Sequence, residues 1–141
     1  MVKHRRQAVQ NEQISYTMKG KWRSLIDVED VILQRIEQIE EDDPDLEVAY
    51  ELIGEENRGI IITVMYDILI SVEFVESDLS WMRELAEEEY LDAGDEDILV
   101  AVIVPNDAFL DVYGRLRRHA LKGIVVLSYE SLGILSTPMA G

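Results

Sequence analysis

The amino-acid sequence predicts a single α/β domain with a mixed sheet of about four strands and three main helices; α+β is the alternative class. In residues 60–76 (IIITVMYDILISVEFVE) every even position up to Phe74 is apolar, and polar side chains such as Thr63, Asp67 and Ser71 occupy odd positions. This period of two is typical of a strand covered on one side. Residues 98–104 (ILVAVIV) are apolar throughout, as in a strand buried on both faces.

The chain is expected to begin with a basic flexible arm, residues 1–12, and to continue as one domain, residues 13–141. The arm is polar and shows no periodicity. A helix is then predicted over 25–41, where apolar residues recur at three- and four-residue spacing. Ser24 is its expected N-cap, and Pro44 prevents it from continuing.

An antiparallel hairpin is predicted next. Its first strand is 46–53, and the polar turn 54–59 leads into 60–76. Because 60–76 contains no Gly, Pro or Asn at which a tight turn would be expected, the pattern indicates one strand of more than twice the usual length. Such a strand either bends or projects past the sheet, where it can pair with another chain.

Two further helices are predicted on either side of the strand 98–104. The first covers 79–91, with Asp78 as N-cap and Gly94 just beyond its end. The second covers 107–121 and leads to a last buried strand, 124–127. Strand, helix and strand form a βαβ unit, which closes right-handed with its two strands parallel.

Charge is distributed unevenly along the chain, whose net charge is −16. Residues 1–24 contain six Lys or Arg and one Glu, or 6 − 1 = +5, so the remainder carries −16 − 5 = −21. An acidic body repels nucleic-acid phosphates and anionic lipids. No membrane partner is therefore expected. A nucleic-acid partner is expected only through the basic residues of the arm and of the stretch that follows it, positions 3–23. The absence of cysteine and of an apolar leader favours a cytoplasmic protein.

The usual catalytic motifs are missing: the chain has no Gly-rich phosphate loop, no HExxH and no GxSxG. Polar residues do follow the three strands expected to be parallel, at the edge where open α/β sheets bind ligands. They are Ser77, Asp78, Asn106, Asp107, Ser128 and Glu130. Asp78, Asp107 and Glu130 are the candidate metal ligands, and Mg²⁺ suits such a set. The alternative is that Asp78 and Asn106 only cap helices; no other cofactor and no catalytic residue is predicted.

The order helix, strands, helix, strand, helix resembles the core of the restriction-endonuclease-like PD-(D/E)XK nucleases over residues 25–131. The segment ILVAVIVPNDAFLDVYGRLRRHALKGIVVLSYES is similar in rhythm to the last strand, helix and strand of that family. Members hold metal with an Asp and with a Glu-x-Lys strand. Here Asp67 or Pro44-Asp45 stands for the first part, and Glu73-Phe74-Val75 for the second. Since Val75 replaces the lysine, the resemblance implies a degenerate member without nuclease activity.

The sequence thus favours a small, acidic, soluble protein-binding or assembly module without catalytic activity, which binds copies of itself or another protein. The overlong strand supports assembly, and so do the opposite charges of arm and body. The first alternative is a metal-dependent nuclease or phosphotransfer enzyme of restriction-endonuclease-like fold. The second is an acidic mimic of nucleic acid, which requires acids along one continuous face at phosphate-like spacing.

Overall fold

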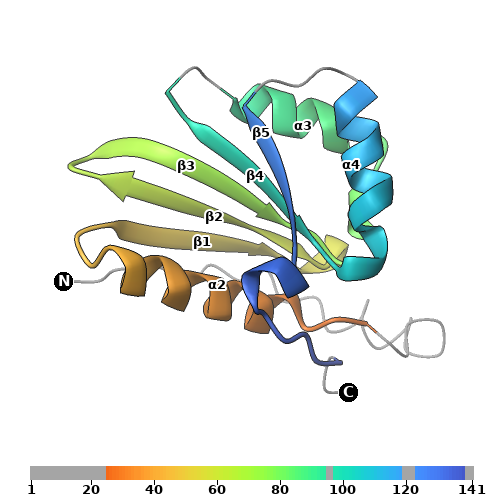
Figure 1. Cartoon of the computed structure of the whole chain (residues 1–141), viewed down its shortest axis with the longest axis horizontal. Coiled ribbons are helices and arrows are strands. Elements are labelled where there is room, and N and C mark those ends of the chain that lie inside the picture. Colours follow the sequence, from red (N-terminus) through yellow and green to blue (C-terminus); the bar gives the residue numbers. More distant parts are fainter. Residues whose placement is uncertain (1–24, 95–96, 119–122, 139–141) are drawn as a thin grey trace.

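The computed structural model describes residues 25–94, 97–118 and 123–138, which form one mixed sheet and three α-helices (Figure 1). The sheet has five strands in the order β1-β2-β3-β4-β5. The predicted α/β class is confirmed, with five strands instead of about four. The predicted arm, residues 1–12, lies outside the described residues.

The first three strands form an antiparallel meander, and the last two extend the sheet in parallel. Their bounds are β1 Glu47–Ile53, β2 Arg58–Met65, β3 Ile68–Val75, β4 Leu99–Val104 and β5 Ile124–Ser128. β1 and β2 are the predicted hairpin, joined through the 3-10 turn η1 (Gly54–Glu56). β4 is parallel to β3 and to β5, so the predicted parallel βαβ unit is confirmed.

The single long strand predicted over 60–76 is wrong, because the chain reverses at Tyr66 and Asp67. These two residues form the turn between β2 and β3, and their φ angles are positive, 50° and 65°. Positive φ at both central positions is the requirement of the two-residue hairpin turn that suits strand twist. Asp tolerates this conformation, whereas a bulky Tyr rarely adopts it. Asn and Gly, which usually mark such a turn, are absent here, so the turn could not be recognised in the sequence.

A one-residue shift in the pairing of β2 with β3 explains why the apolar alternation continues across this turn. Met65 pairs with Ile68, but beyond the shift, which follows Thr63, Ile62 pairs with Val72. A two-residue turn alone pairs even positions with odd positions. Because of the extra residue, even-numbered residues of β2 pair with even-numbered residues of β3. A bulged hairpin therefore shows the same alternation of apolar residues along the sequence as one straight strand.

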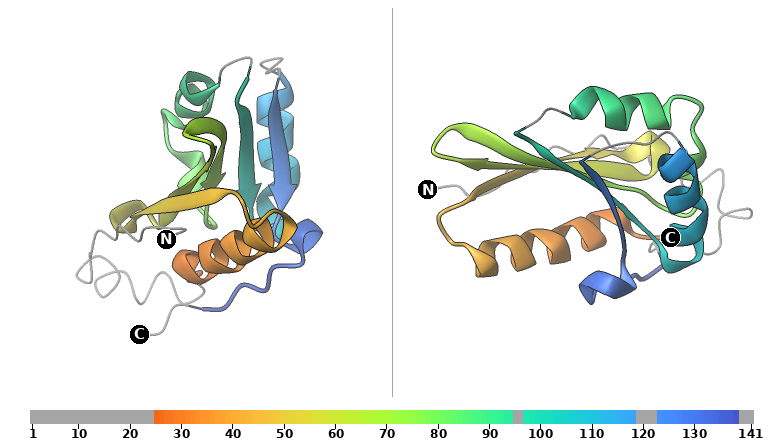
Figure 2. Two further views of the ribbon diagram at one scale, coloured as in Figure 1. Left: turned by 90° about the vertical axis from the view of Figure 1, so that its left-hand side faces the viewer. Right: turned by 45° about the horizontal axis from the view of Figure 1, so that its top comes forward.

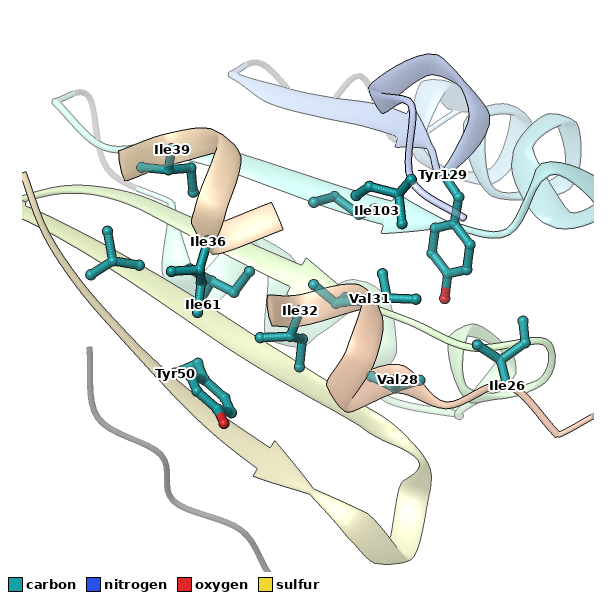
Figure 3. Packing of buried hydrophobic residues seen from close by; sticks show 13 residues of the cluster. Ile26, Val28, Val31, Ile32, Ile36, Ile39, Tyr50, Ile61, Ile103 and Tyr129 are labelled. Carbon is teal, nitrogen blue, oxygen red and sulfur yellow. The ribbon is translucent and has the colours of Figure 1, made fainter. Parts of the chain in front are cut away.

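α2 (Val28–Asp42) covers one face of the sheet. Its N-cap is Asp27, whose carboxylate accepts a hydrogen bond from the Asp30 N–H at 3.2 Å; the predicted cap, Ser24, lies outside the described residues. Figure 3 shows the apolar stripe of α2 packed against side chains from the strands. The buried cluster on this face comprises Ile26, Val28, Val31, Ile32, Ile36, Ile39, Val48, Tyr50, Ile61, Val75, Ile103, Tyr129 and Ile134.

α3 (Ala86–Ala93) and α4 (Phe109–Arg118) cover the opposite face (Figure 1). The helix predicted over 79–91 is divided into a short 3-10 helix, η2 (Ser80–Met82), and α3, because Arg83 between them is extended (φ −56°, ψ 145°). Asp78 consequently does not cap α3. Among the described helices, none has both the length and the apolar character needed to cross a membrane.

Replacing the turn by Tyr66→Asn together with Asp67→Gly is expected to stabilise the fold by about 1 kcal/mol, because both new residues adopt positive φ readily. Tyr66 is 80 % exposed, so its ring contributes little to the core. Urea unfolding measures the change. Tyr66→Ala is the control, since it removes the ring but keeps a Cβ at positive φ, and it should not stabilise. A double variant less stable than the wild type would contradict the expectation.

Candidate functional site

Two buried carboxylates belong to β3 and its end, and the first of them, Glu73, faces α2. Arg35 of α2 donates to both of its oxygens, from Nε to Oε1 at 2.8 Å and from Nη2 to Oε2 at 2.9 Å. Arg35 Nη1 donates to Gln38 Oε1 at 3.1 Å. The hydrogen bond to Glu73 raises the pKa of Arg35 in spite of its partial burial. The charge of Glu73 is therefore already neutralised within the protein by a bidentate pair.

The second carboxylate, Glu76, lies just beyond β3 and is fully buried. Its Oε1 accepts hydrogen bonds from Ser80 Oγ at 2.6 Å and Arg83 Nη1 at 2.7 Å, and its Oε2 accepts from the Tyr90 hydroxyl at 2.6 Å. The Tyr129 hydroxyl donates to the Glu76 backbone carbonyl. A buried charge is tolerated only with such partners. These contacts join the end of β3 to η2, α3 and the end of β5, which is a structural role.

Further ion pairs extend this network to β2. Arg83 Nη2 donates to Glu89 Oε1 at 2.7 Å, and Glu89 also accepts from both terminal nitrogens of Arg58, at 2.9 and 3.0 Å. Arg58 begins β2, is buried, and donates from Nε to Glu56 at 2.6 Å. Glu56, Arg58, Glu76, Arg83 and Glu89 together are the charge cluster, of which Arg58 and Glu76 are buried. It connects η1, β2, β3 and α3, so it fixes the position of α3 on the sheet.

The predicted magnesium ligands Asp78, Asp107 and Glu130 follow β3, β4 and β5 in turn. Glu130 is bound to Asn106: its N–H donates to Asn106 Oδ1 at 2.9 Å, and its Oε2 accepts from Asn106 Nδ2 at 3.1 Å. Asp78 Oδ1 is buried without a hydrogen-bond partner among the described residues. Burial raises the pKa of Asp78, and the charge of Asp107 raises it further. Within the part of the chain that the structure describes, no three acidic, His or Cys side chains group as metal ligands, so Mg²⁺ at this edge stays a prediction.

The remaining sequence-predicted positions are dispersed. Ser77 and Ser128 each donate a backbone N–H to the hydroxyl of the serine three residues later, at 2.7 and 3.1 Å. Asp67 is exposed in the hairpin turn, and Asp45 is exposed in the turn after α2. Val75, at the position of the nuclease lysine, is fully buried beneath α2.

On the α2 side of the sheet, two apolar side chains of β4 and β5 are exposed, although Ser71, Glu73 and Ala101 on the same side are buried. Leu99 pairs with Ser71, and Val125 pairs with Ala101, which in turn pairs with Glu73. Leu99 and Val125 therefore point to the same side of the sheet as Glu73. The left view of Figure 2 shows the beginnings of β4 and β5 extending away from α2.

Three large apolar side chains are exposed on three neighbouring strands. Ile68 is 66 % exposed, Leu99 50 % and Val125 41 %. The sequence predicted the strands that contain Leu99 and Val125 to be buried. That prediction is wrong at these two residues, because α2 packs mainly on β1 and β2, with fewer contacts to β3.

Two exposed carboxylates lie close to these side chains along the sequence. Asp67 precedes Ile68 in the turn, and Asp97 lies two residues before Leu99. Asp42, in the last turn of α2, is near enough to Arg35 to raise its pKa. We call Ile68, Leu99 and Val125 the open face. Apolar patches with a polar rim are typical of interaction sites.

Comparison of the chain with protein-family models, with curated proteins and with solved structures finds no match. The function must therefore be inferred from the residues and from their arrangement.

Tyr90 is expected to make the free energy of unfolding fall above about pH 10. Burial and the adjacent Glu76 raise the pKa of Tyr90, so the folded protein keeps this proton where an unfolded Tyr, with a pKa of about 10, loses it. The unfolded chain then binds fewer protons, and stability decreases as the pH rises.

Tyr90→Phe tests this by urea unfolding from neutral to alkaline pH. At neutral pH the variant should lose about 1–2 kcal/mol, since Glu76 loses a donor, and above pH 10 its stability should fall less steeply than that of the wild type. Tyr113→Phe is the control, because Tyr113 is 46 % exposed, and it should change neither value. An unaltered alkaline slope in Tyr90→Phe would contradict the expectation.

Proposed function

We propose that this chain is a cytoplasmic protein-binding module without catalytic activity, and that it assembles with copies of itself. The observation that carries the proposal is the open face, where the apolar side chains of Ile68, Leu99 and Val125 are exposed on three neighbouring strands. Water contact with such side chains is unfavourable, and a partner that covers them gains roughly 25 cal/mol for each Å² of apolar surface buried.

The interior supports the non-catalytic part of the proposal. Glu73 is neutralised by Arg35, and Glu76 accepts hydrogen bonds on both oxygens. A general acid or base must be within reach of the proton it transfers, and Glu76 is fully buried among its own partners. Neither carboxylate is presented to a substrate.

The distribution of charge restricts the class of partner. The described residues include 6 Arg and 26 Asp or Glu, a net charge of 6 − 26 = −20. Arg35, Arg58 and Arg83 form ion pairs with carboxylates of the same chain. Each pair removes one positive and one negative charge, so the remaining groups keep the full net charge of −20, which disfavours nucleic acid and favours a partner with cationic groups.

Self-assembly is tested by light scattering over a range of micromolar concentrations. The wild type is expected to be a dimer or a larger closed oligomer, and Ile68→Lys, which places a charge on the open face, should give a folded monomer of 16.2 kDa. The matched control is Leu110→Lys: Leu110 is 77 % exposed but lies on α4, on the other side of the sheet. A wild type that is monomeric throughout would refute the proposal.

The nuclease alternative makes a different prediction. With Glu73 held by Arg35 and valine in place of the motif lysine, plasmid DNA and single-stranded DNA should remain intact when incubated with the protein and Mg²⁺. Gel electrophoresis detects cleavage. Cleavage that disappears in Glu73→Ala would favour the enzyme over the binding module, whereas cleavage that persists in this variant would indicate a contaminating nuclease.

A further inference from the structure

We infer that the outward face of α4 is a second protein-binding surface, and that it takes an acidic amphipathic helix of a partner protein. The inference goes beyond the proposed self-assembly, because α4 covers the face of the sheet opposite to α2, whereas Leu99 and Val125 point to the α2 side. Three features of α4 support it: the spacing of its exposed residues, a glycine in its interior, and its positive charge.

The exposed residues of α4 form one stripe along the helix. α4 packs on the sheet through two buried residues, Val112 and Leu116. Four residues at positions i, i+3, i+4 and i+7 share the outward face, and we call them the α4 stripe: Leu110, Tyr113, Gly114 and Arg117. Leu110 is 77 % exposed and Tyr113 46 %, and Arg117 is exposed as well. This is the spacing with which amphipathic helices contact a partner.

Tyr113 is held in position within the chain itself. Its ring stacks on the ring of Phe109, with 5.9 Å between the centroids and 14° between the planes. Phe109 in turn packs against the buried cluster on this side of the sheet. A fixed aromatic ring offers a large contact area at a low cost in side-chain entropy. Tyr and Arg are also the residue types most often found to contribute strongly to binding, so Tyr113 and Arg117 suit the role of anchors.

Gly114 lies in the interior of α4, where glycine is unfavourable because its backbone loses more freedom than that of alanine. A Cβ at this position would meet no atom within 4 Å. Packing within the chain therefore does not require a glycine here. A glycine on the α4 stripe does allow the backbone of a second helix to approach closely, because the distance between packed helices depends on the side chains at the contact.

The positive charge of α4 indicates the chemistry of the partner. Of the six arginines of the described residues, Arg35, Arg58 and Arg83 pair with carboxylates of the same chain. The other three all belong to α4: Arg115, Arg117 and Arg118. With the single Asp of this helix, the net charge of α4 is 3 − 1 = +2, on a body that is otherwise acidic. An acidic partner is thus attracted to α4 and repelled by the rest of the surface.

Two other occupants match the α4 stripe less well. The amino-terminal segment of the same chain, residues 1–24, carries a net charge of 6 − 1 = +5, which has the same sign as that of α4. A second copy brings a net charge of −16 against an equal charge, whereas a single acidic helix brings only a few negative charges. A helix with apolar side chains on one side and carboxylates beside them meets Leu110, Tyr113 and the arginines together.

The first experiment uses a synthetic amphipathic peptide of about 18 residues, or five helical turns, with Leu and Ala on one face and Glu on the other. Fluorescence anisotropy of the labelled peptide should show binding to the full chain. Leu110→Lys and Arg117→Glu should each weaken binding by about tenfold or more. The matched control is Leu135→Lys, since Leu135 is also 77 % exposed but follows β5, and it should bind the peptide as the wild type does.

Several outcomes would overturn the inference. They are a lack of binding, equal binding of a peptide with Lys in place of Glu, and binding that ignores Leu110→Lys. Tighter binding of a labelled oligouridine than of the peptide would indicate nucleic acid instead. Light scattering should give the same oligomer for Leu110→Lys as for the wild type; an oligomer that dissociates in this variant would make a second copy the occupant.

The second experiment is Gly114→Ala, for which stability and binding should change in opposite directions. The midpoint of urea unfolding should rise, because alanine favours the helix and its Cβ meets no neighbour in the free chain. Binding of the acidic peptide should weaken by about tenfold, because the new Cβ keeps the two helices apart. A stabilised variant that binds the peptide as tightly as the wild type does would overturn the inference.

Discussion

The fold depends on one buried charge, the carboxylate of Glu76. Its backbone N–H donates to the Ile103 carbonyl at 2.8 Å, so the residue still belongs to the pairing between β3 and β4 when its side chain turns inward. Taking a carboxylate out of water costs several kcal/mol unless charged and hydroxyl donors replace the lost water. Ser80, Arg83 and Tyr90 supply these donors. The chain between β3 and β4 is thus required to bring all three side chains to a single point, and this requirement breaks the predicted helix at Arg83.

Most of the architecture could be predicted because it rests on local signals. The hairpin of β1 and β2 and the unit of β4, α4 and β5 follow from polar turns and apolar runs that the sequence displays directly. The reversal at Tyr66 and Asp67 could not be predicted, for two physical reasons. The turn places a Tyr, which rarely adopts positive φ, before the Asp, and contains neither Asn nor Gly. In addition, the one-residue shift in register lets the apolar residues keep the same alternation on both sides of the turn.

The candidate site could be predicted in part only. Glu73 was recognised in the sequence as a notable acid, but its partner, Arg35, lies 38 positions away on another element, and no spacing rule connects the two. Leu99 and Val125 stand in apolar runs that are indistinguishable from core strands. Whether such residues are buried depends on how far a helix extends across the sheet, and that is a property of the packed structure.

The pairing of charges in the interior determines what the surface can bind. Arg58 and Arg83 form ion pairs within the charge cluster and Arg35 pairs with Glu73, so three of the six arginines of the described residues are engaged with carboxylates of the same chain. The exposed acids are left with few positive neighbours, and copies of the body repel one another at low ionic strength. Apolar contact alone would have to overcome this repulsion.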